Sequence, residues 1–348
     1  QVNKIQHMLP LNDLLLLTTG AIWAASGAGE NQPISPAGIR AKVQSYAGAS
    51  DVRPLVIDDS ALYVEDKQRS VRDLFYTFQS DSFTGQDLSI MARHLFEDRD
   101  IVEWDFAREP NSVVWCVMSD GTLLSMTYVR THEIWGWCRH DTDGDVESVC
   151  SIGEGDEDAV YLIVKRTIDG ATKRYVERLT RPTTTDPSDA FYVDCGLQYD
   201  GAATTTLSGL DHLEGEEVAI VGDGNVLPRR TVSGGSITLA NPVSKASVGL
   251  PYTAEIETLE MEAEVAGGMA MRKRAVKKVH LLINNSRALF VGAGQGEQLD
   301  EIAQRSTSQD YDSFIPLESG WREITVQGGW SKQGRVYIQS PEPMPFEI

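Results

Sequence analysis

Residues 112–140 read SVVWCVMSDGTLLSMTYVRTHEIWGWCRH, three apolar-rich runs joined by short polar links. Val113–Val117 is rich in β-branched and aromatic residues, which favour strands. Asp120-Gly121 predicts a hairpin turn, because both residues tolerate positive φ. Leu123–Val129 predicts the returning strand, and Ile134–Cys138 predicts a third strand with both of its tryptophans on one face. The stretch therefore predicts a β-meander.

The following segment repeats this plan. Val160–Val164 predicts a strand, Asp169-Gly170 a turn and Arg174–Leu179 the returning strand. In both units a Tyr-Val pair follows the Asp-Gly turn, at Tyr128-Val129 and at Tyr175-Val176. The shared layout indicates an internal repeat.

Two earlier apolar runs extend this repeat toward the N-terminus. Leu14–Leu17 and Leu62–Val64 begin similar strands, so that four strand starts lie about 45 to 50 residues apart. That spacing is typical of a propeller blade of four short strands. The sequence therefore predicts an incomplete or irregular β-propeller-like domain. A β-sandwich with evenly spaced strands is the alternative.

One segment departs from the β pattern. Asp87 can cap a helix, and the apolar residues after it recur at helical spacing. These residues are Leu88, Met91, Ala92, Leu95 and Phe96. We expect one short amphipathic helix near 87–96, with His94 on its polar side as a surface residue.

The chain is predicted to divide into three regions. Residues 1–186 form the propeller-like domain, and the Pro- and Thr-rich segment 181–187 is expected to be a linker. Residues 187–252 contain short strands with Gly-rich turns, which predict a small antiparallel β module. Residues 253–348 are expected to form a second, sandwich-like β region.

Composition excludes several classes of protein. The chain has 348 residues, 51 acidic and 31 basic, for a net charge of −20. An acidic chain is unsuited to gripping nucleic acid by its phosphates. No apolar run is long enough to span a membrane, and the N-terminus lacks a secretory signal pattern. The sequence starts without Met, which we interpret as a trimmed chain. The basic residues Arg272, Lys273, Arg274, Lys277 and Lys278 are expected to form a solvated strand face.

The four cysteines are widely spaced at Cys116, Cys138, Cys150 and Cys195. This spacing favours free thiols in a reducing compartment. A bond between Cys116 and Cys138 remains open, because their strands could be neighbours. A zinc site of Cys116, Cys138 and His140 has suitable ligand types but matches no known short motif.

No segment carries a recognised catalytic or cofactor motif. Asp141, Asp143 and Asp145 partly match a calcium loop, but Gly144 and Ile152 are wrong for an EF-hand, so a polar turn is favoured. The acidic run 154–158 is expected to be another solvated turn. The glycines of 292–296 lack the strand-to-helix context of a dinucleotide site. We therefore expect no catalytic, cofactor-binding or metal-binding residues, and no enzyme.

A carbohydrate-active β-propeller is the enzymatic alternative. A glycosidase needs two carboxylates beside a cleft. With 51 acids the sequence singles out no pair. This alternative predicts a deep pocket with paired acids and tryptophans.

Five stretches together resemble a known family. They are NDLLLLTTGAIW (12–23), SYAGASDVRPLVI (45–57), RSVRDLFYTFQSDSFTGQDLSIMARHLF (69–96), EPNSVVWCVMSDGTLLSMTYVRTHEIWGW (109–137) and HLEGEEVAIVGDG (212–224). The chain resembles the tail nozzle, or tail tubular, proteins of short-tailed bacteriophages and prophages over about residues 10–290. Members of that family usually carry additional N-terminal sequence.

The resemblance implies a virion structural protein that is assembled in the bacterial cytoplasm and located in the tail. Such proteins form a ring, typically of six subunits, next to the portal and adaptor proteins. They line or close the channel through which the DNA leaves, and they attach tail fibres or a needle. The resemblance also implies that DNA passes without specific binding, and it carries over no catalytic residues. The isolated chain is expected to be monomeric.

Overall fold

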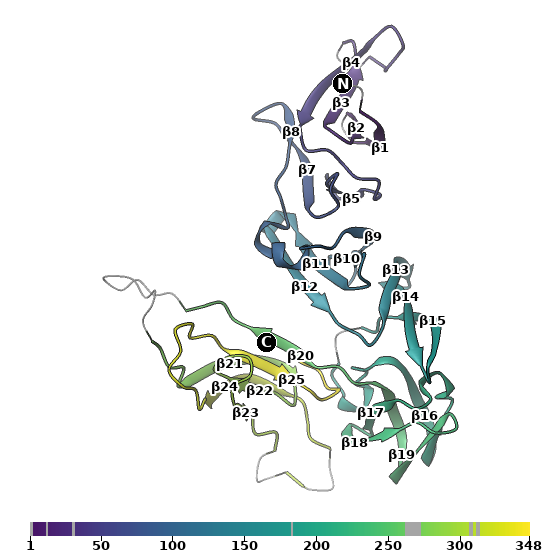
Figure 1. Cartoon of the computed structure of the whole chain (residues 1–348), viewed down its shortest axis with the longest axis vertical. Helices are drawn as coiled ribbons and strands as arrows, with labels where there is room; N and C mark the ends of the chain where they lie inside the picture. Colours follow the sequence, from purple (N-terminus) through teal and green to yellow (C-terminus); the bar gives the residue numbers. More distant parts are fainter. Residues whose placement is uncertain are drawn as a thin grey trace. The chain divides into compact units, whose positions relative to one another are not determined.

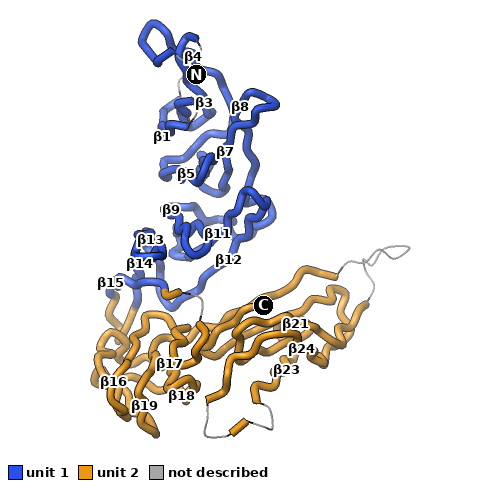
Figure 2. The backbone as a smooth tube through the Cα atoms, turned by 180° about the vertical axis from the view of Figure 1, so that it is seen from behind, with its two compact units in different colours: residues 1–166, 173–179 blue, residues 167–172, 180–348 orange. Residues whose placement is uncertain are grey.

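The computed structural model describes residues 3–11, 13–29, 32–181, 184–261, 273–305, 309–310 and 314–348. The protein is mainly β and is built from several small antiparallel sheets, as predicted. No closed propeller is identified in this described part. The chain divides into two compact units, residues 1–166 with 173–179 (unit 1) and residues 167–172 with 180–348 (unit 2), coloured separately in Figure 2.

In unit 1 the described residues form four sheets, each made of strands that follow one another in the chain. Sheet 1 is β1 (Ile5–Pro10), β2 (Leu14–Thr18), β3 (Ile22–Gly27) and β4 (Ile39–Ser45). Sheet 2 is β5 (Leu55–Ile57), β6 (Ser60–Val64), β7 (Val71–Thr77) and β8 (Ser82–Thr84). Sheet 3 is β9 (Ile101–Ala107), β10 (Val113–Met118), β11 (Leu123–Val129) and β12 (Ile134–His140). Sheet 4 is β13 (Asp145–Glu154), β14 (Glu157–Ile168) and β15 (Ala171–Arg178).

The four sheets of unit 1 pack in series, in chain order, as Figure 1 shows. Leu15, Leu17 and Ile22 of sheet 1 share a buried cluster with Tyr63 and Leu74 of sheet 2. A second cluster joins sheets 2 and 3, and a third joins sheets 3 and 4. Each interface therefore buries an apolar sheet face against the next sheet, as burial of apolar area requires.

The evenly spaced strand starts are explained by this series. Leu14, Leu62, Val113 and Val160 lie on β2, β6, β10 and β14, the second strand of each sheet. One repeat of the sequence thus corresponds to one small sheet. Unit 1 has four sheets, whereas a sandwich has two.

The two Asp-Gly turns form as predicted but with different backbones. Asp169 and Gly170 both have positive φ, at 51° and 69°. At the earlier turn only Gly121 does, with φ 84°, and Asp120 Oδ1 instead accepts a hydrogen bond from Thr122 N at 3.1 Å. The Asp side chain stabilises that turn as an Asx-type turn does.

The predicted helix is a short 3-10 segment, η1 (Ile90–Leu95), with a non-helical residue at Ala92. Leu88, Ala92 and Phe96 are buried, but Met91 is 86% exposed. The prediction of Met91 on the buried face was wrong, because the tighter 3-10 winding turns it outward. The prediction of Asp87 as the helix cap was wrong, because the N-cap is Ser89. Asp87 Oδ1 instead accepts hydrogen bonds from the backbone N and the hydroxyl of Ser89, at 2.8 and 2.6 Å. His94 is exposed as expected.

The described residues of unit 2 form three sheets. The first is β16 (Asp194–Ser208), β19 (Ser236–Leu250), β17 (Glu217–Gly222) and β18 (Asn225–Thr231), in that spatial order. The second is β20 (Ala254–Glu257), β25 (Tyr337–Ser340), β22 (Phe290–Gly292) and β23 (Leu299–Glu301). The third pairs β21 (Lys278–Ser286) with β24 (Glu318–Thr325). Short 3-10 segments are η2 (Arg130–His132) in unit 1, and η3 (Pro187–Asp189) and η4 (Asp211–Leu213) in unit 2.

The first sheet of unit 2 has its own apolar cluster, and the other two sheets share another. A small cluster of Ala190, Val221 and Met344 joins the parts of unit 2. The predicted linker 181–187 leads into η3; its residues 182–183 lie outside the described residues.

Candidate interaction surfaces

The polar residues considered from the sequence do not converge into a metal site. No group of three or more His, Cys, Asp or Glu side chains in the described ranges is placed to hold a metal ion. Asp141 and Asp145 instead pair with Arg139 at 2.8 Å and with Lys165 at 2.9 Å. The run 154–158 is the hairpin between β13 and β14, where Glu154 and Glu157 both bind Arg178.

The cysteines are free. Cys116 lies on β10 opposite Leu124 of β11, whereas Cys138 of β12 lies opposite Ser125. Because Leu124 and Ser125 point to opposite faces, the two thiols are separated by a strand and face apart. This arrangement excludes both the disulfide and the zinc site with His140. Burial also raises the pKa of the Cys116 thiol, which makes it unreactive.

The basic cluster is only partly described, since Arg272 lies outside the described residues. Lys278 begins β21 and forms an ion pair with Glu323, whereas Lys273 and Lys277 are exposed but precede the strand. Arg274 is partly buried and forms a backbone bridge with Ser331. The prediction of one strand face was therefore wrong, although Lys273, Lys277 and Lys278 are solvated as expected.

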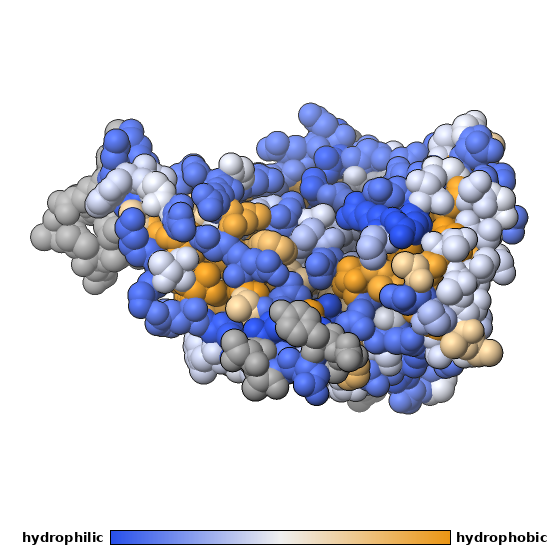
Figure 3. Space-filling view, turned by 90° about the horizontal axis from the view of Figure 1, so that it is seen from below, coloured by the Kyte–Doolittle hydropathy of each residue, from blue (hydrophilic) through white to orange (hydrophobic). Residues whose placement is uncertain are grey.

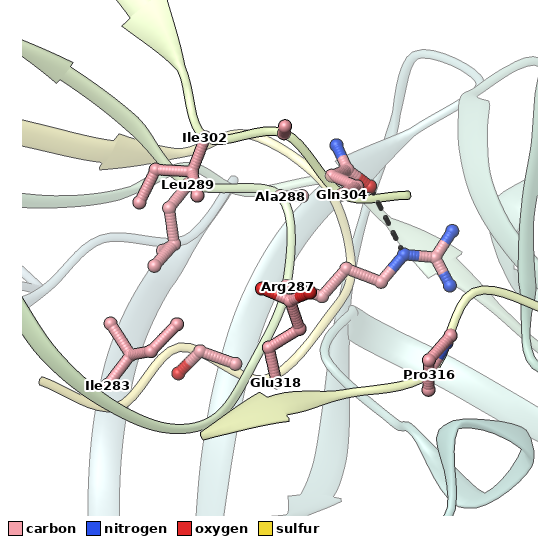
Figure 4. Close-up of a pocket in the computed structure, with 10 residues that line it drawn as sticks. Ile283, Arg287, Ala288, Leu289, Ile302, Gln304, Pro316 and Glu318 are labelled. Carbon is pink, nitrogen blue, oxygen red and sulfur yellow. Dashed lines mark hydrogen bonds between the residues drawn. The ribbon is translucent and has the colours of Figure 1, made fainter. Parts of the chain in front are cut away.

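A small pocket in unit 2 surrounds Arg287 (Figure 4). It encloses about 260 Å³, counting space open to solvent, which is below the usual range for small-molecule sites. Its lining includes Ile283, Leu289 and Ile302, and Glu318 is its one acid. This pocket lacks the tryptophans and paired acids that the carbohydrate-active alternative predicts.

Arg287 acts in this region as an internal clamp. The side chain is 7% exposed and extends toward Gln304 and Pro316, away from Ile283. Its Nη1 donates to the carbonyl oxygens of Gly224 at 3.0 Å and Ile315 at 3.2 Å. Burial lowers the pKa of Arg287, and these carbonyl oxygens accept hydrogen bonds from some of its five donors. The arginine ties the β17–β18 turn to the chain that leads into β24.

A more informative surface is the face of sheet 1 that points away from sheet 2. Strand register places Met8, Leu16, Trp23 and Val43 in one row across all four strands. Further rows on the same face complete a set that we call the sheet-1 outer face: Met8, Pro10, Leu14, Leu16, Trp23, Ala25, Ile39, Ala41 and Val43.

The sheet-1 outer face is apolar and uncharged. Met8 is 63% exposed and Ile39 54% exposed, whereas Ala25 is 1% exposed. Next to Ala25, backbone oxygens of Gln32 and Pro33 lie over Gly27, so the chain itself covers part of this face. The run Leu14–Leu17 lacks polar alternation, and a strand of this kind is typically buried on both sides. That run was the signal in the sequence that could have indicated this surface.

The opposite end of the series is different. The face of sheet 4 that points away from sheet 3, the sheet-4 outer face, is defined by Cys150, Ile152, Glu154, Glu157, Tyr161, Ile163, Lys165, Arg174, Val176 and Arg178. Arg178 bridges Glu154 and Glu157, and Arg174 binds Glu147 through two hydrogen bonds of 2.6 and 2.9 Å. Charged side chains on this face are thus paired with each other.

An exposed tryptophan marks a third surface, in unit 2. Trp321 of β24 lies opposite Leu282 of β21, and the two are 69% and 53% exposed. His280 and Glu323 form the adjacent pair on this face. In Figure 3 the surface seen from below shows separate apolar patches among hydrophilic residues.

The comparisons with known proteins add no identity. No protein family and no curated protein matches the chain at a significant level. Among the described residues, no helix has the length and apolar content needed to cross a membrane.

Proposed function

We propose that the protein is a structural component of a bacteriophage or prophage tail, forming part of a ring, or nozzle, at the end of the DNA channel. The observation that carries the proposal is the series of four small sheets joined by apolar clusters. A series of this kind makes a rigid wall, and the five stretches that resemble nozzle proteins lie mostly within it. In this proposal the chain takes part in genome retention and ejection and in fibre attachment.

The same proposal includes a more detailed description of the fold. Sheets 1 to 4 would act as propeller-like blades, in an incomplete or irregular arrangement. The sheet β16–β19 would form a small antiparallel module, and the last two sheets of unit 2, which share one apolar cluster, a sandwich-like region.

The partners follow from the resemblance and the charge. The ring is proposed to contain six copies joined by heterologous contacts, next to portal and adaptor proteins and to a tail fibre or needle. With a net charge of −20, a lumen lined by acids repels DNA and lets it slide. Salt limits this repulsion to about 8 to 10 Å.

Mass measurement tests the ring. The protein is mixed with its adaptor, and a mass of six copies per adaptor ring is expected. A monomer that persists under these conditions would overturn the nozzle role. DNA binding at physiological salt is a second measurement, because tight binding would contradict a repulsive channel.

The alternative is a receptor-binding tail protein that recognises carbohydrate, and the exposed Trp321 favours it. A flat indole ring beside polar groups such as His280 and Glu323 can stack on a sugar ring. Binding of host polysaccharide to the protein, lost in Trp321→Ala, would support this function. Trp330→Ala is the matched control, since Trp330 is 70% exposed but lies outside β24. Equal loss of binding in both variants, or no binding by the parent protein, would contradict the receptor-binding function.

A further inference from the structure

Strand β12 lies at one edge of sheet 3, beside β11. Its 7 residues, Ile134–His140, pair with β11 without any register shift, and none of them is buried. The free side of an edge strand presents a row of unpaired N–H and C=O groups, to which another extended strand can add. β12 therefore offers a regular and accessible backbone edge.

The direction of each backbone group of β12 follows from the neighbouring ladder. The amide of Tyr128 on β11 donates to a carbonyl oxygen beside β10, at 3.0 Å. Because backbone groups alternate in direction along a strand, those of Thr127 point toward β12, where its partner is Gly136. The backbone groups of Trp135 and Trp137 therefore point away from β11, along the free edge.

Several other edge strands carry features that hinder pairing with a further strand. β16 has register shifts against β19, and β1 has a register shift and ends at Pro10. β18 contains Pro228, which has no N–H to donate. β12 has no such feature, and Gly136 leaves open space where a side chain would lie. The edge of β12 is therefore open to a further strand.

The charges at the two ends of β12 favour a second β12 as that strand. In an antiparallel pair of copies, a twofold axis at Gly136 places Arg139 of each copy opposite Glu133 of the other. An axis at Trp137 would instead place Glu133 opposite Asp141, two like charges. Opposite charges across a strand pair are stabilising and like charges are destabilising. The sequence of β12 is thus complementary to itself about Gly136.

We propose that β12 pairs antiparallel with β12 of a second copy of this chain, about a twofold axis at Gly136. Trp135 of each copy lies opposite Trp137 of the other, and the two pairs exchange their outward hydrogen bonds. Gly136 meets its own copy at the centre, where its open face permits close approach. The contact is isologous, so it does not rest on the proposed ring, whose contacts are heterologous.

The small size of this contact sets the expected affinity. One strand per copy takes part, whereas a standard interface uses about 20 to 30 residues a side. We therefore expect a short-lived dimer and a purified chain that is mostly monomeric in dilute solution. Covalent trapping is the suitable measurement for such a contact.

Disulfide trapping of the full chain tests the proposal. Cys138→Ser/Cys150→Ser removes the two exposed thiols, and Gly136→Cys then places a new thiol at the twofold axis. Residues opposite each other there have Cα atoms about 4.5 Å apart, which a disulfide can span. Under mild oxidation we expect covalent dimer to form about tenfold faster than in the matched control Thr127→Cys. Thr127 is exposed on the same face, one strand further from the edge.

Charge reversal tests the register of the pair. Adding Glu133→Arg to the Gly136→Cys chain is expected to slow trapping about two- to tenfold, because arginines then face each other. Adding Arg139→Glu as well should restore the rate. Equal trapping in Gly136→Cys and Thr127→Cys would overturn the proposal, and so would a charge-exchanged chain that traps more slowly than Glu133→Arg alone. Circular dichroism of each variant confirms folding.

Discussion

The first and last sheets of unit 1 end the same series in opposite ways. Sheet 1 presents an outer face of uncharged side chains, among them Leu16 and Trp23. Sheet 4 presents a face on which Arg174 and Arg178 bind carboxylates of the same sheet. Both faces also carry exposed apolar side chains, among them Met8 on sheet 1 and Val176 on sheet 4. The comparison shows that the two ends differ in charge, because only the sheet-4 face combines its apolar residues with paired ions.

The largest expected effect comes from removing a buried ion pair, in contrast to the exposed ion pairs of sheet 4. The Asp73 side chain is fully buried between sheets 2 and 3 and binds Arg130, whose guanidinium lies 3.3 Å from the centre of the Phe75 ring. Asp73 also accepts a hydrogen bond from Gln86 N at 2.7 Å. Asp73→Ala is expected to lower the free energy of unfolding by about 3 kcal/mol or more, because it leaves Arg130 and the Gln86 amide without an acceptor. Urea unfolding measures the change, and a loss below about 1 kcal/mol would show that the pair behaves like a surface pair.

Leucines on the two sides of β2 give the next largest contrast. Leu17 is fully buried against sheet 2, so Leu17→Ala is expected to cost about 2 to 5 kcal/mol. Leu16 points to the sheet-1 outer face, and Leu16→Ala in the monomer is expected to cost less than half as much. Urea unfolding at low protein concentration compares them. Equal costs would mean that the outer face is already packed within one chain.

The exposed pair of sheet 4 should contribute little. Arg174→Ala removes the two hydrogen bonds to Glu147 at a site where both side chains are accessible to solvent. We expect a fall in the melting temperature of at most a few degrees at low salt, and none in 0.5 M salt, because salt screens exposed charges. A large loss that persists in high salt would contradict the idea that this face is a solvated one.

The smallest expected effect is a pH dependence of the same face. Hydrogen bonds from Arg174 lower the pKa of Glu147, and the hydrogen bond from Tyr161, followed by that from Arg178, lowers the pKa of Glu154. A carboxylate with a lowered pKa in the folded state adds stability above its unfolded pKa of about 4, and this is lost as the pH falls through the folded value. The small difference in melting temperature between the parent protein and Glu147→Gln should therefore shrink as the pH falls below the unfolded pKa of about 4.

Much of the strand arrangement follows from local sequence. Alternating and β-branched runs located β10, β11 and β14, and the Asp-Gly pairs located their hairpins, because both signals act between near neighbours. The spacing of Leu14, Leu62, Val113 and Val160 indicated one sheet per repeat. The ring, its partners and the role in DNA ejection stay predictions.

Other features depend on contacts that sequence does not encode locally. The segment η1 winds as a 3-10 helix although its apolar residues recur at α-helical spacing. Leu88 and Phe96 pack into the apolar cluster between sheets 2 and 3, and Met91 stays outside it. The role of Arg287 depends on Gly224, which is 63 residues away in the chain. Whether the thiols of Cys116 and Cys138 can meet depends on strand register. They lie opposite neighbouring residues of β11, whose side chains point to opposite faces of the sheet.

Serial packing also has a consequence for cooperativity. Each sheet of unit 1 touches mainly its neighbours, so its folding free energy resembles a sum of nearest-neighbour terms, as in repeat proteins. Sheets 1 and 4 each share such a cluster on one side only, whereas sheets 2 and 3 do so on both. Sheet 1 should therefore fray before the interior sheets, and amide hydrogens of β2 and β3 should exchange faster than those of β10 and β11.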